Sequence, residues 1–190
     1  REDPTVNRLE EKAAEMLGKE AALFVPSGTM ANQVALKTHC VAGDEIIVGN
    51  DSHVFLFEGG AAAVISGVTL NLRNVRRGLL DVDDVASAVR PHDVHAPVTR
   101  LVWIENTHNR GGGAVYPVAR VAALSGFARS KGLGLHMDGA RLFNAVAATG
   151  TSAAEYASHC DSVTFCLSKG LGCPVGSLIA GSADFIKRAM

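Results

Sequence analysis

The sequence of 190 residues predicts an α/β fold with a mostly parallel sheet and helices on both faces. Short apolar runs that fit buried strands alternate with longer segments that fit amphipathic helices. The run over residues 100–104 is hydrophobic almost throughout, as expected of a strand covered on both faces. No internal repeat and no linker rich in Pro, Gly or Ser divides the chain, so we expect one domain over residues 1–190.

The first half of the chain opens with a helix predicted over residues 4–17, where Leu9, Ala13 and Leu17 share one face. The elements expected next are, in chain order, a strand over 21–25, a helix over 30–40, a strand over 46–48, a helix of small residues around 59–65, a strand over 68–72 and a helix over 82–89 opened by Asp81.

The second half of the chain continues this alternation. The elements expected there are a strand over 100–104, a helix over 118–131, strands over 133–137 and 162–167, and a helix that starts near Ser182. In such sheets, ligands bind outside the carboxyl ends of the strands. The residues that fall at such ends are Ser27, His53, His108, Asp138 and Lys169.

The composition is that of an ordinary globular protein, with 47% hydrophobic residues, 19% charged residues and a formal net charge of −1. The 18 Lys and Arg residues form no basic block, which argues against nucleic acid as the main partner. No apolar run approaches the roughly 18 residues of a membrane-spanning helix, so no membrane is expected as a partner. The cysteines form no C-x-x-C pair, which favours reduced thiols, a cytoplasmic location and no metal site.

Lys169 is the most informative residue, because it follows an apolar run and precedes the stretch Gly170-Leu171-Gly172. A lysine at the end of a buried strand has two functional interpretations: it binds a phosphate, or it forms a Schiff base with a carbonyl group. Asp138 ends the preceding apolar run, and its simplest interpretation alone is a helix cap. Together, the two residues favour pyridoxal phosphate, which needs a carboxylate for its pyridinium nitrogen and a lysine for its aldehyde.

Four other features have both a structural and a functional interpretation. The turn Ser27-Gly28-Thr29 caps a helix or binds a phosphate dianion, although it is not a P-loop. His53 and His108 are satisfied loop residues or participants in the chemistry. Arg141 is a solvated helix residue or a ligand for a substrate carboxylate. His136, on the same strand face as Asp138, is a candidate to orient that carboxylate.

Several short stretches occur together in the order typical of one enzyme family. They are Asp3-Pro4-Thr5-Val6-Asn7, Gly18-Lys19-Glu20-Ala21-Ala22, Pro26-Ser27-Gly28-Thr29-Met30-Ala31-Asn32, Glu105-Asn106-Thr107-His108-Asn109, His136-Met137-Asp138-Gly139-Ala140-Arg141 and Ser168-Lys169-Gly170-Leu171-Gly172. On these stretches the chain resembles the low-specificity L-threonine aldolases, which are fold type I pyridoxal-phosphate enzymes within the wider β-eliminating lyase group. The resemblance runs over the whole length of the chain.

The resemblance implies the large, cofactor-binding domain of a fold type I enzyme, and it assigns roles around pyridoxal 5'-phosphate. Lys169 is implied to carry the cofactor as a Schiff base, with Ser168 beside it. Asp138 is implied to pair with the pyridinium nitrogen, and Ser27-Gly28-Thr29 to form part of the phosphate cup. His53 is implied to stack on the cofactor ring.

The same resemblance places two residues near the substrate. Arg141 is implied to line the cofactor site and contact the substrate carboxylate, and His108 to lie close to the substrate side chain. His53 and His108 are both candidates for the base that removes the β-hydroxyl proton, directly or through a water. The expected catalytic residues are therefore Lys169, Asp138, His53 and His108.

The reaction that the resemblance implies is aldol cleavage of L-threonine or L-allo-threonine to glycine and acetaldehyde, by a homodimer or homotetramer. Two alternatives stay open: a pyridoxal-phosphate-dependent β-eliminating lyase acting on another amino acid, and an inactive cofactor-binding fragment. The chain begins without the family's N-terminal segment and ends inside an expected helix at Met190. From this we expect the C-terminal small domain to be absent.

Overall fold

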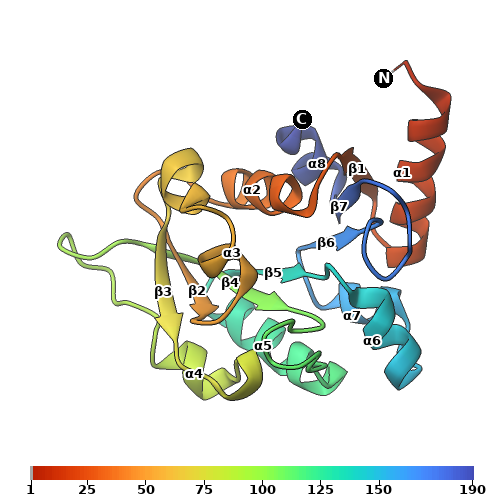
Figure 1. The fold of residues 1–190 in the computed structure, drawn as a ribbon. Coiled ribbons are helices and arrows are strands. Elements are labelled where there is room, and N and C mark those ends of the chain that lie inside the picture. Colours follow the sequence, from red (N-terminus) through yellow and green to blue (C-terminus); the bar gives the residue numbers. More distant parts are fainter. Residues whose placement is uncertain (1) are drawn as a thin grey trace.

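The structure, a computed structural model, describes residues 2–190 and contains one seven-stranded sheet with strand order β1-β7-β6-β5-β4-β2-β3 (Figure 1). The strands are β1 (Ala21–Val25), β2 (Glu45–Gly49), β3 (Thr69–Arg73), β4 (Thr99–Glu105), β5 (Gly134–Asp138), β6 (Ser162–Cys166) and β7 (Ser177–Gly181). The pairs β3/β2, β2/β4, β4/β5 and β5/β6 are parallel, whereas β7 runs antiparallel to both β6 and β1. The predicted α/β fold with a mostly parallel sheet is confirmed.

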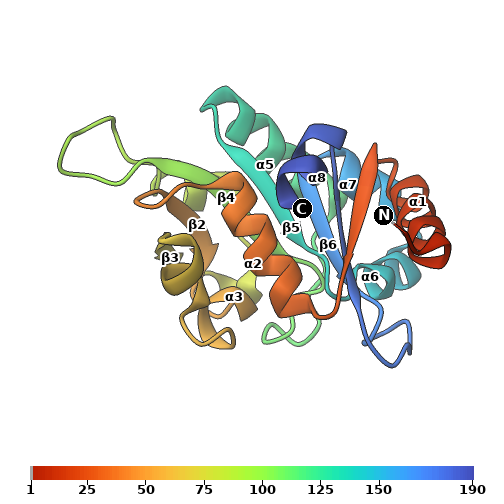
Figure 2. The same ribbon diagram turned by 90° about the horizontal axis from the view of Figure 1, so that it is seen from above.

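Helices cover both faces of the sheet, as Figures 1 and 2 show from two directions. Their bounds are α1 (Pro4–Leu17), α2 (Gly28–His39), α3 (His53–Leu56), α4 (Val82–Ala86), α5 (Val118–Ser130), α6 (Leu142–Thr149), α7 (Ala153–Ser158) and α8 (Ala183–Ala189), with a π-helix η1 (Ala62–Ser66) and a 3₁₀ turn η2 (Arg76–Gly78). Helices α1 and α4 to α7 pack on one face, and α2, α8 and η1 pack on the other.

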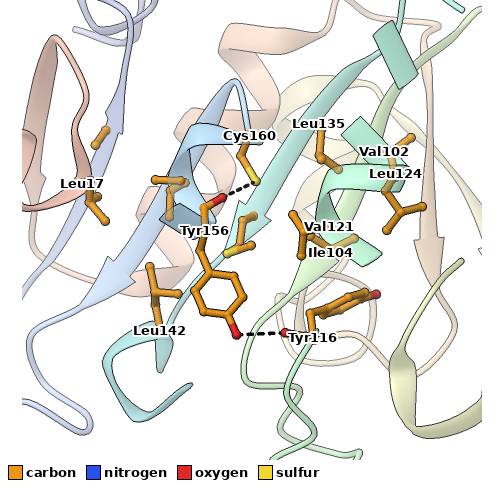
Figure 3. Close-up of a cluster of buried hydrophobic side chains, with 14 of the residues drawn as sticks. Leu17, Val102, Ile104, Tyr116, Val121, Leu124, Leu135, Leu142, Tyr156 and Cys160 are labelled. Carbon is orange, nitrogen blue, oxygen red and sulfur yellow. Dashed lines mark hydrogen bonds between the residues drawn. The ribbon is translucent and has the colours of Figure 1, made fainter. Parts of the chain in front are cut away.

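The central strands carry apolar residues on both faces because successive residues of a strand pack into the cores on opposite sides of the sheet. Ile47 on β2 packs against the core under α1 and α4 to α7, while Ile46 and Val48 pack against the core under α2 and η1. In the first core, the hydroxyl of Tyr156 donates to the backbone oxygen of Tyr116 at 2.9 Å (Figure 3). Both rings are fully buried, so this bond satisfies a phenol that burial would otherwise penalise.

The structure corrects three expectations about individual elements. Strand β7 was not predicted. The helix expected around residues 59–65 is present as the π-helix η1, which begins only at Ala62 because Gly59 and Gly60 both adopt left-handed backbone angles that a right-handed helix does not allow. Helix α4 ends at Ala86 rather than at residue 89. Over residues 2–190, no helix combines the length and apolar character needed to cross a membrane.

Candidate active site

The N-terminus of α2 lies against the end of β6. The hydroxyl of Ser27 caps α2 by accepting a hydrogen bond from the Met30 N–H at 3.2 Å. A Cβ atom at Gly28 would come within 2.7 Å of the Cys166 sulfur and 3.9 Å of the Lys169 ammonium. Glycine is therefore required for this close approach, which brings the first N–H groups of the helix next to Lys169.

Asp138, at the carboxyl end of β5, is only 3% exposed. Its Oδ2 accepts a hydrogen bond from Asn32 Nδ2 at 2.8 Å, and its Oδ1 accepts one from the Ala140 N–H at 3.1 Å. Burial raises the pKa of Asp138 to about 6, and the nearby Glu105 carboxylate adds to this shift, while the Asn32 bond and the Lys169 charge oppose it. A carboxylate in this position is stabilised by any cationic group that contacts it.

Lys169 lies three residues beyond β6, in the turn that leads toward β7. Its charge acts on the pKa values of both Asp138 and His53, so the three groups share one electrostatic environment. Within the described part of the chain, its ammonium has no hydrogen-bond partner. The structure therefore brings together Lys169, Asp138, His53 and the Ser27-Gly28-Thr29 turn at the carboxyl ends of the strands.

His53 is the first residue of α3, and two carboxylates contact it, one at its backbone and one at its ring. Its backbone N–H donates to Glu105 Oε2 at 2.9 Å, and its ring Nδ1 lies 2.9 Å from Glu58 Oε1. The hydrogen bond to Glu58 raises the pKa of His53, an effect that burial opposes and the Asp138 charge reinforces. The His53 side chain is 29% exposed, so its ring remains accessible at the surface of the site.

Sequence reasoning missed Glu58, which joins several residues of the site. Its carboxylate accepts hydrogen bonds from Asn32 Nδ2 at 2.7 Å and Gln33 Nε2 at 2.6 Å, in addition to its contact with His53. Since Asn32 Nδ2 also donates to Asp138, one amide connects the two carboxylates. The available signal was the pair of adjacent amides, Asn32 and Gln33, in the buried part of an otherwise apolar helix segment.

His108 lies in a closed environment. Its ring is fully buried, its Nδ1 accepts a hydrogen bond from the Gly111 N–H at 3.0 Å, and its Nε2 lies 3.3 Å from Asp51 Oδ1. Gly78 packs directly over the ring. The same loop is attached to β4 because Glu105 Oε1 accepts the Asn109 N–H at 2.9 Å. The His108 side chain is thus enclosed by the protein, whereas the His53 side chain is partly exposed to solvent.

Three other residues considered from the sequence have different surroundings. His136 does not orient Asp138: its Nδ1 lies 2.7 Å from the Ser162 hydroxyl on β6, and Asn32 contacts Asp138 instead. Arg141 lies just before α6 and is partly exposed, and its guanidinium group forms no hydrogen bond or ion pair with any described residue. Ser168 is exposed beside Lys169.

Comparisons with known proteins give a consistent result. The sequence profile of the family described as Beta-eliminating lyase matches residues 1–190. The chain is 50% identical over 190 residues to the low specificity L-threonine aldolase of Escherichia coli O157:H7, covering 100% of this chain and 56% of that protein. It is 45% identical over 191 residues to the low-specificity L-threonine aldolase 1 of Arabidopsis thaliana, covering 98% of this chain and 53% of that protein.

Solved structures agree with these sequence matches. A putative L-allo-threonine aldolase from Listeria monocytogenes superimposes with a TM-score of 0.86 at 30% identity, over 98% of this chain and 51% of that one. The Leishmania major threonine aldolase does so with a TM-score of 0.83 at 25% identity, over 91% of this chain and 51% of that one. The chain therefore spans about half the length of the relatives that it matches.

Proposed function

Because this chain belongs to the β-eliminating lyase family over its whole length, we propose that it is the cofactor-binding part of a pyridoxal-phosphate-dependent aldehyde-lyase. The proposed reaction is cleavage of L-threonine or L-allo-threonine to glycine and acetaldehyde. The observation that carries the proposal is the position of the buried Asp138 and of Lys169 at or just beyond the ends of the neighbouring strands β5 and β6, where the Lys169 charge acts on the pKa of Asp138 beside the N-terminus of α2. Relatives named as threonine aldolases support the choice of substrate.

The residues present fit pyridoxal phosphate, on which threonine aldolases and other members of the family depend. Asp138 would hold the ring nitrogen, since a buried carboxylate with a raised pKa is stabilised by a cationic N–H group. The N-terminus of α2, brought close by Gly28, would hold the phosphate. Lys169 would hold the aldehyde carbon. When bound, the cofactor supplies an electron sink for the bond that breaks at the substrate Cα.

The side chains of this protein supply the positioning and the proton transfer. His53 is the better-placed base, because its Nδ1 contacts Glu58 and its ring is accessible, which leaves Nε2 to take the β-hydroxyl proton directly or through a water. His108 stays a second candidate, with both of its ring nitrogens close to protein groups. Arg141 would bind the substrate carboxylate with its unpaired guanidinium group.

The proposal extends to assembly and location. A hollow of about 450 Å³ beside the N-terminus of α2 is lined by Met30, Val34, Ala61 and Ile65, among others. Met30 and Ile65 are exposed apolar residues, which supports coverage by a second copy of the chain in a homodimer or homotetramer. All four cysteines are free thiols, which supports a reducing compartment such as the cytoplasm and a role in threonine breakdown and glycine formation there.

The proposal is tested by product analysis of the chain incubated with pyridoxal phosphate and L-threonine or L-allo-threonine. We expect glycine and acetaldehyde in equal amounts, and neither from the Lys169→Ala variant. Release of ammonia and a keto acid from another amino acid would instead identify a β-eliminating lyase. Cofactor binding without turnover of any amino acid would identify an inactive cofactor-binding fragment and contradict the proposal.

A further inference from the structure

Glu58 is a buried carboxylate that enters the proposed reaction only through its contact with His53. Its side chain is fully buried, and it accepts hydrogen bonds from Asn32 and Gln33 in addition to contacting His53. Among the residues that the structure describes, no lysine or arginine forms an ion pair with it. Burial of a carboxylate is costly without such partners, so the fold keeps Glu58 in place through neutral amides and one imidazole.

The two amides fix the direction of the Glu58 carboxylate. Asn32 Nδ2 has two hydrogens, and it lies 2.7 Å from Glu58 Oε1 and 2.8 Å from Asp138 Oδ2. Asn32 Oδ1 accepts the Thr164 hydroxyl at 3.2 Å, which sets the orientation of the amide. Gln33 Nε2 holds the other oxygen of Glu58 at 2.6 Å. The hydrogen bonds from Asn32 and Gln33 therefore fix the position of the Glu58 carboxylate relative to the His53 ring.

This geometry determines where the His53 ring carries its proton. A carboxylate oxygen only accepts hydrogen bonds, so the 2.9 Å contact with Glu58 Oε1 requires a hydrogen on His53 Nδ1. The neutral ring then has its lone pair on Nε2, the nitrogen farther from Glu58. The charged groups that act on His53 are Glu58, Asp138 and Lys169, and Glu105 contacts only its backbone N–H. Of these, Glu58 forms the only hydrogen bond to the ring itself.

We propose that Glu58 is a positioning residue, which fixes the proton of His53 on Nδ1 and so presents Nε2 to the substrate. The consequence for catalysis rests on the proposed function, whereas the tautomer and the orientation are properties of the protein alone. The role differs from that of Asp138, because Glu58 acts through the histidine and has no accessible surface of its own.

The test uses nitrogen-15 NMR of the histidine rings in the whole chain without cofactor. For the unmodified protein we expect neutral His53 with hydrogen on Nδ1, and a titration midpoint above the ordinary value of about 6.5. Glu58→Gln should lower that midpoint by about one unit or more and weaken the preference for the Nδ1 tautomer. Glu58→Asp, which keeps the charge, should retain more of the midpoint shift than Glu58→Gln does.

A matched control is Glu15→Gln, which makes the same chemical change at an exposed position paired with Lys12. It should leave the His53 spectrum unchanged. If Glu58→Gln does not fold, the unmodified protein still decides the question. Hydrogen on Nε2 in neutral His53, or a midpoint at or below the ordinary value, overturns the proposal.

Kinetics of the cofactor-loaded protein separate this inference from the proposed function. If His53 behaves as expected by NMR but no variant or parent cleaves threonine, the proposed function fails and the positioning of His53 by Glu58 stands. If the parent cleaves threonine and Glu58→Gln leaves both the NMR midpoint and the pH profile of kcat unchanged, the inference fails and the proposed function stands. If the parent cleaves threonine, and Glu58→Gln shifts the NMR midpoint and the pH profile of kcat while Glu15→Gln does not, the inference and the proposed function are both supported.

Discussion

Among the described residues, the two shortest histidine–carboxylate contacts near the carboxyl end of β4 are His53–Glu58 and His108–Asp51, and in these two pairs the buried and the exposed partner are exchanged. In the His53–Glu58 pair, the imidazole side chain is 29% exposed and the carboxylate side chain is 0% exposed. In the His108–Asp51 pair, the imidazole is 0% exposed and the carboxylate is 29% exposed. The same two chemical groups therefore give a histidine that a ligand can reach in one case and a histidine held inside the protein in the other.

Glu105 connects the two regions. One of its oxygens accepts the backbone N–H of His53 and the other accepts that of Asn109, the residue after His108. Both loops are thus attached to the end of the same strand, and the difference between the histidines arises from their own surroundings. Glu58 holds one ring through its Nδ1, whereas Gly78 and Gly111 enclose the other. We infer that the two pairs have different tasks, proton transfer for the first and loop structure for the second.

The largest effect that would distinguish the two pairs is expected from His53→Phe. Phenylalanine keeps an aromatic ring for stacking but removes the proton-accepting nitrogen, so threonine cleavage at saturating substrate should slow by roughly 10²- to 10⁴-fold. Steady-state kinetics at saturating cofactor, with an absorbance spectrum to show that cofactor is bound, would measure this. An unchanged turnover rate would exclude His53 as the base and leave His108 as the candidate.

A third histidine, His39, differs from His53 in the direction of its pKa shift, which predicts an opposite effect of pH on stability. Burial lowers the pKa of His39 to about 4, with Asp161 opposing and Arg188 adding to the shift, whereas the pKa of His53 is raised. A folded-state pKa below the unfolded value of about 6.5 means that the unfolded chain binds the proton first as pH falls. His39 should therefore reduce the free energy of unfolding by up to about 3 kcal/mol as pH falls from about 6.5 to about 4.

Urea unfolding at a series of pH values would measure this loss, and His39→Gln, which can still contact Ser162, should reduce it. His53 should act in the opposite direction, since its contribution to stability is present below about pH 6.5 and is lost as pH rises through its raised pKa. The same acid dependence in the parent and in His39→Gln would show that His39 is not its source.

His108→Phe should affect stability more than catalysis. The substitution leaves the partly buried Gly111 N–H without its acceptor, and an unsatisfied donor costs up to about 1 to 3 kcal/mol when it is buried. For the protein that folds, the turnover rate should stay within about tenfold of the parent, far less than the effect of removing a base. Thermal unfolding and kinetics on the same preparation would separate the two effects. Turnover slowed by about a hundredfold or more, with normal stability, would reverse the assignment of the two histidines.

The smallest effect is expected from Asp51→Asn. Asp51 is partly exposed and lies 3.3 Å from His108 Nε2 without the alignment of a hydrogen bond, so its charge contributes about 1 kcal/mol or less. Denaturant unfolding of Asp51→Asn and of the parent would show a small difference. A loss as large as that for His108→Phe would mean that the contact with Asp51, rather than the one with Gly111, holds the histidine.

The sequence predicted the residues whose position follows from a strand end. Asp138 and Lys169 follow apolar runs, and Ser27 precedes a helix, so their convergence at one edge of the sheet was predictable from the order of elements. Glu58 and Glu105 were not predicted as part of the network, because their importance depends on donors from segments distant in the chain. His136 was assigned the wrong partner, since strand-face periodicity does not show that Ser162 lies opposite it on the next strand.

Borohydride reduction of the chain mixed with pyridoxal phosphate, followed by peptide mapping, tests directly whether Lys169 and Asp138 form a cofactor site. We expect a cofactor absorbance band before reduction and, after it, a stable adduct on Lys169 alone. Asp138→Asn should still give the adduct, with an altered band. An adduct on another lysine, or no adduct in a chain that circular dichroism shows to be folded, would contradict the claim that Lys169 and Asp138 form a pyridoxal-phosphate site.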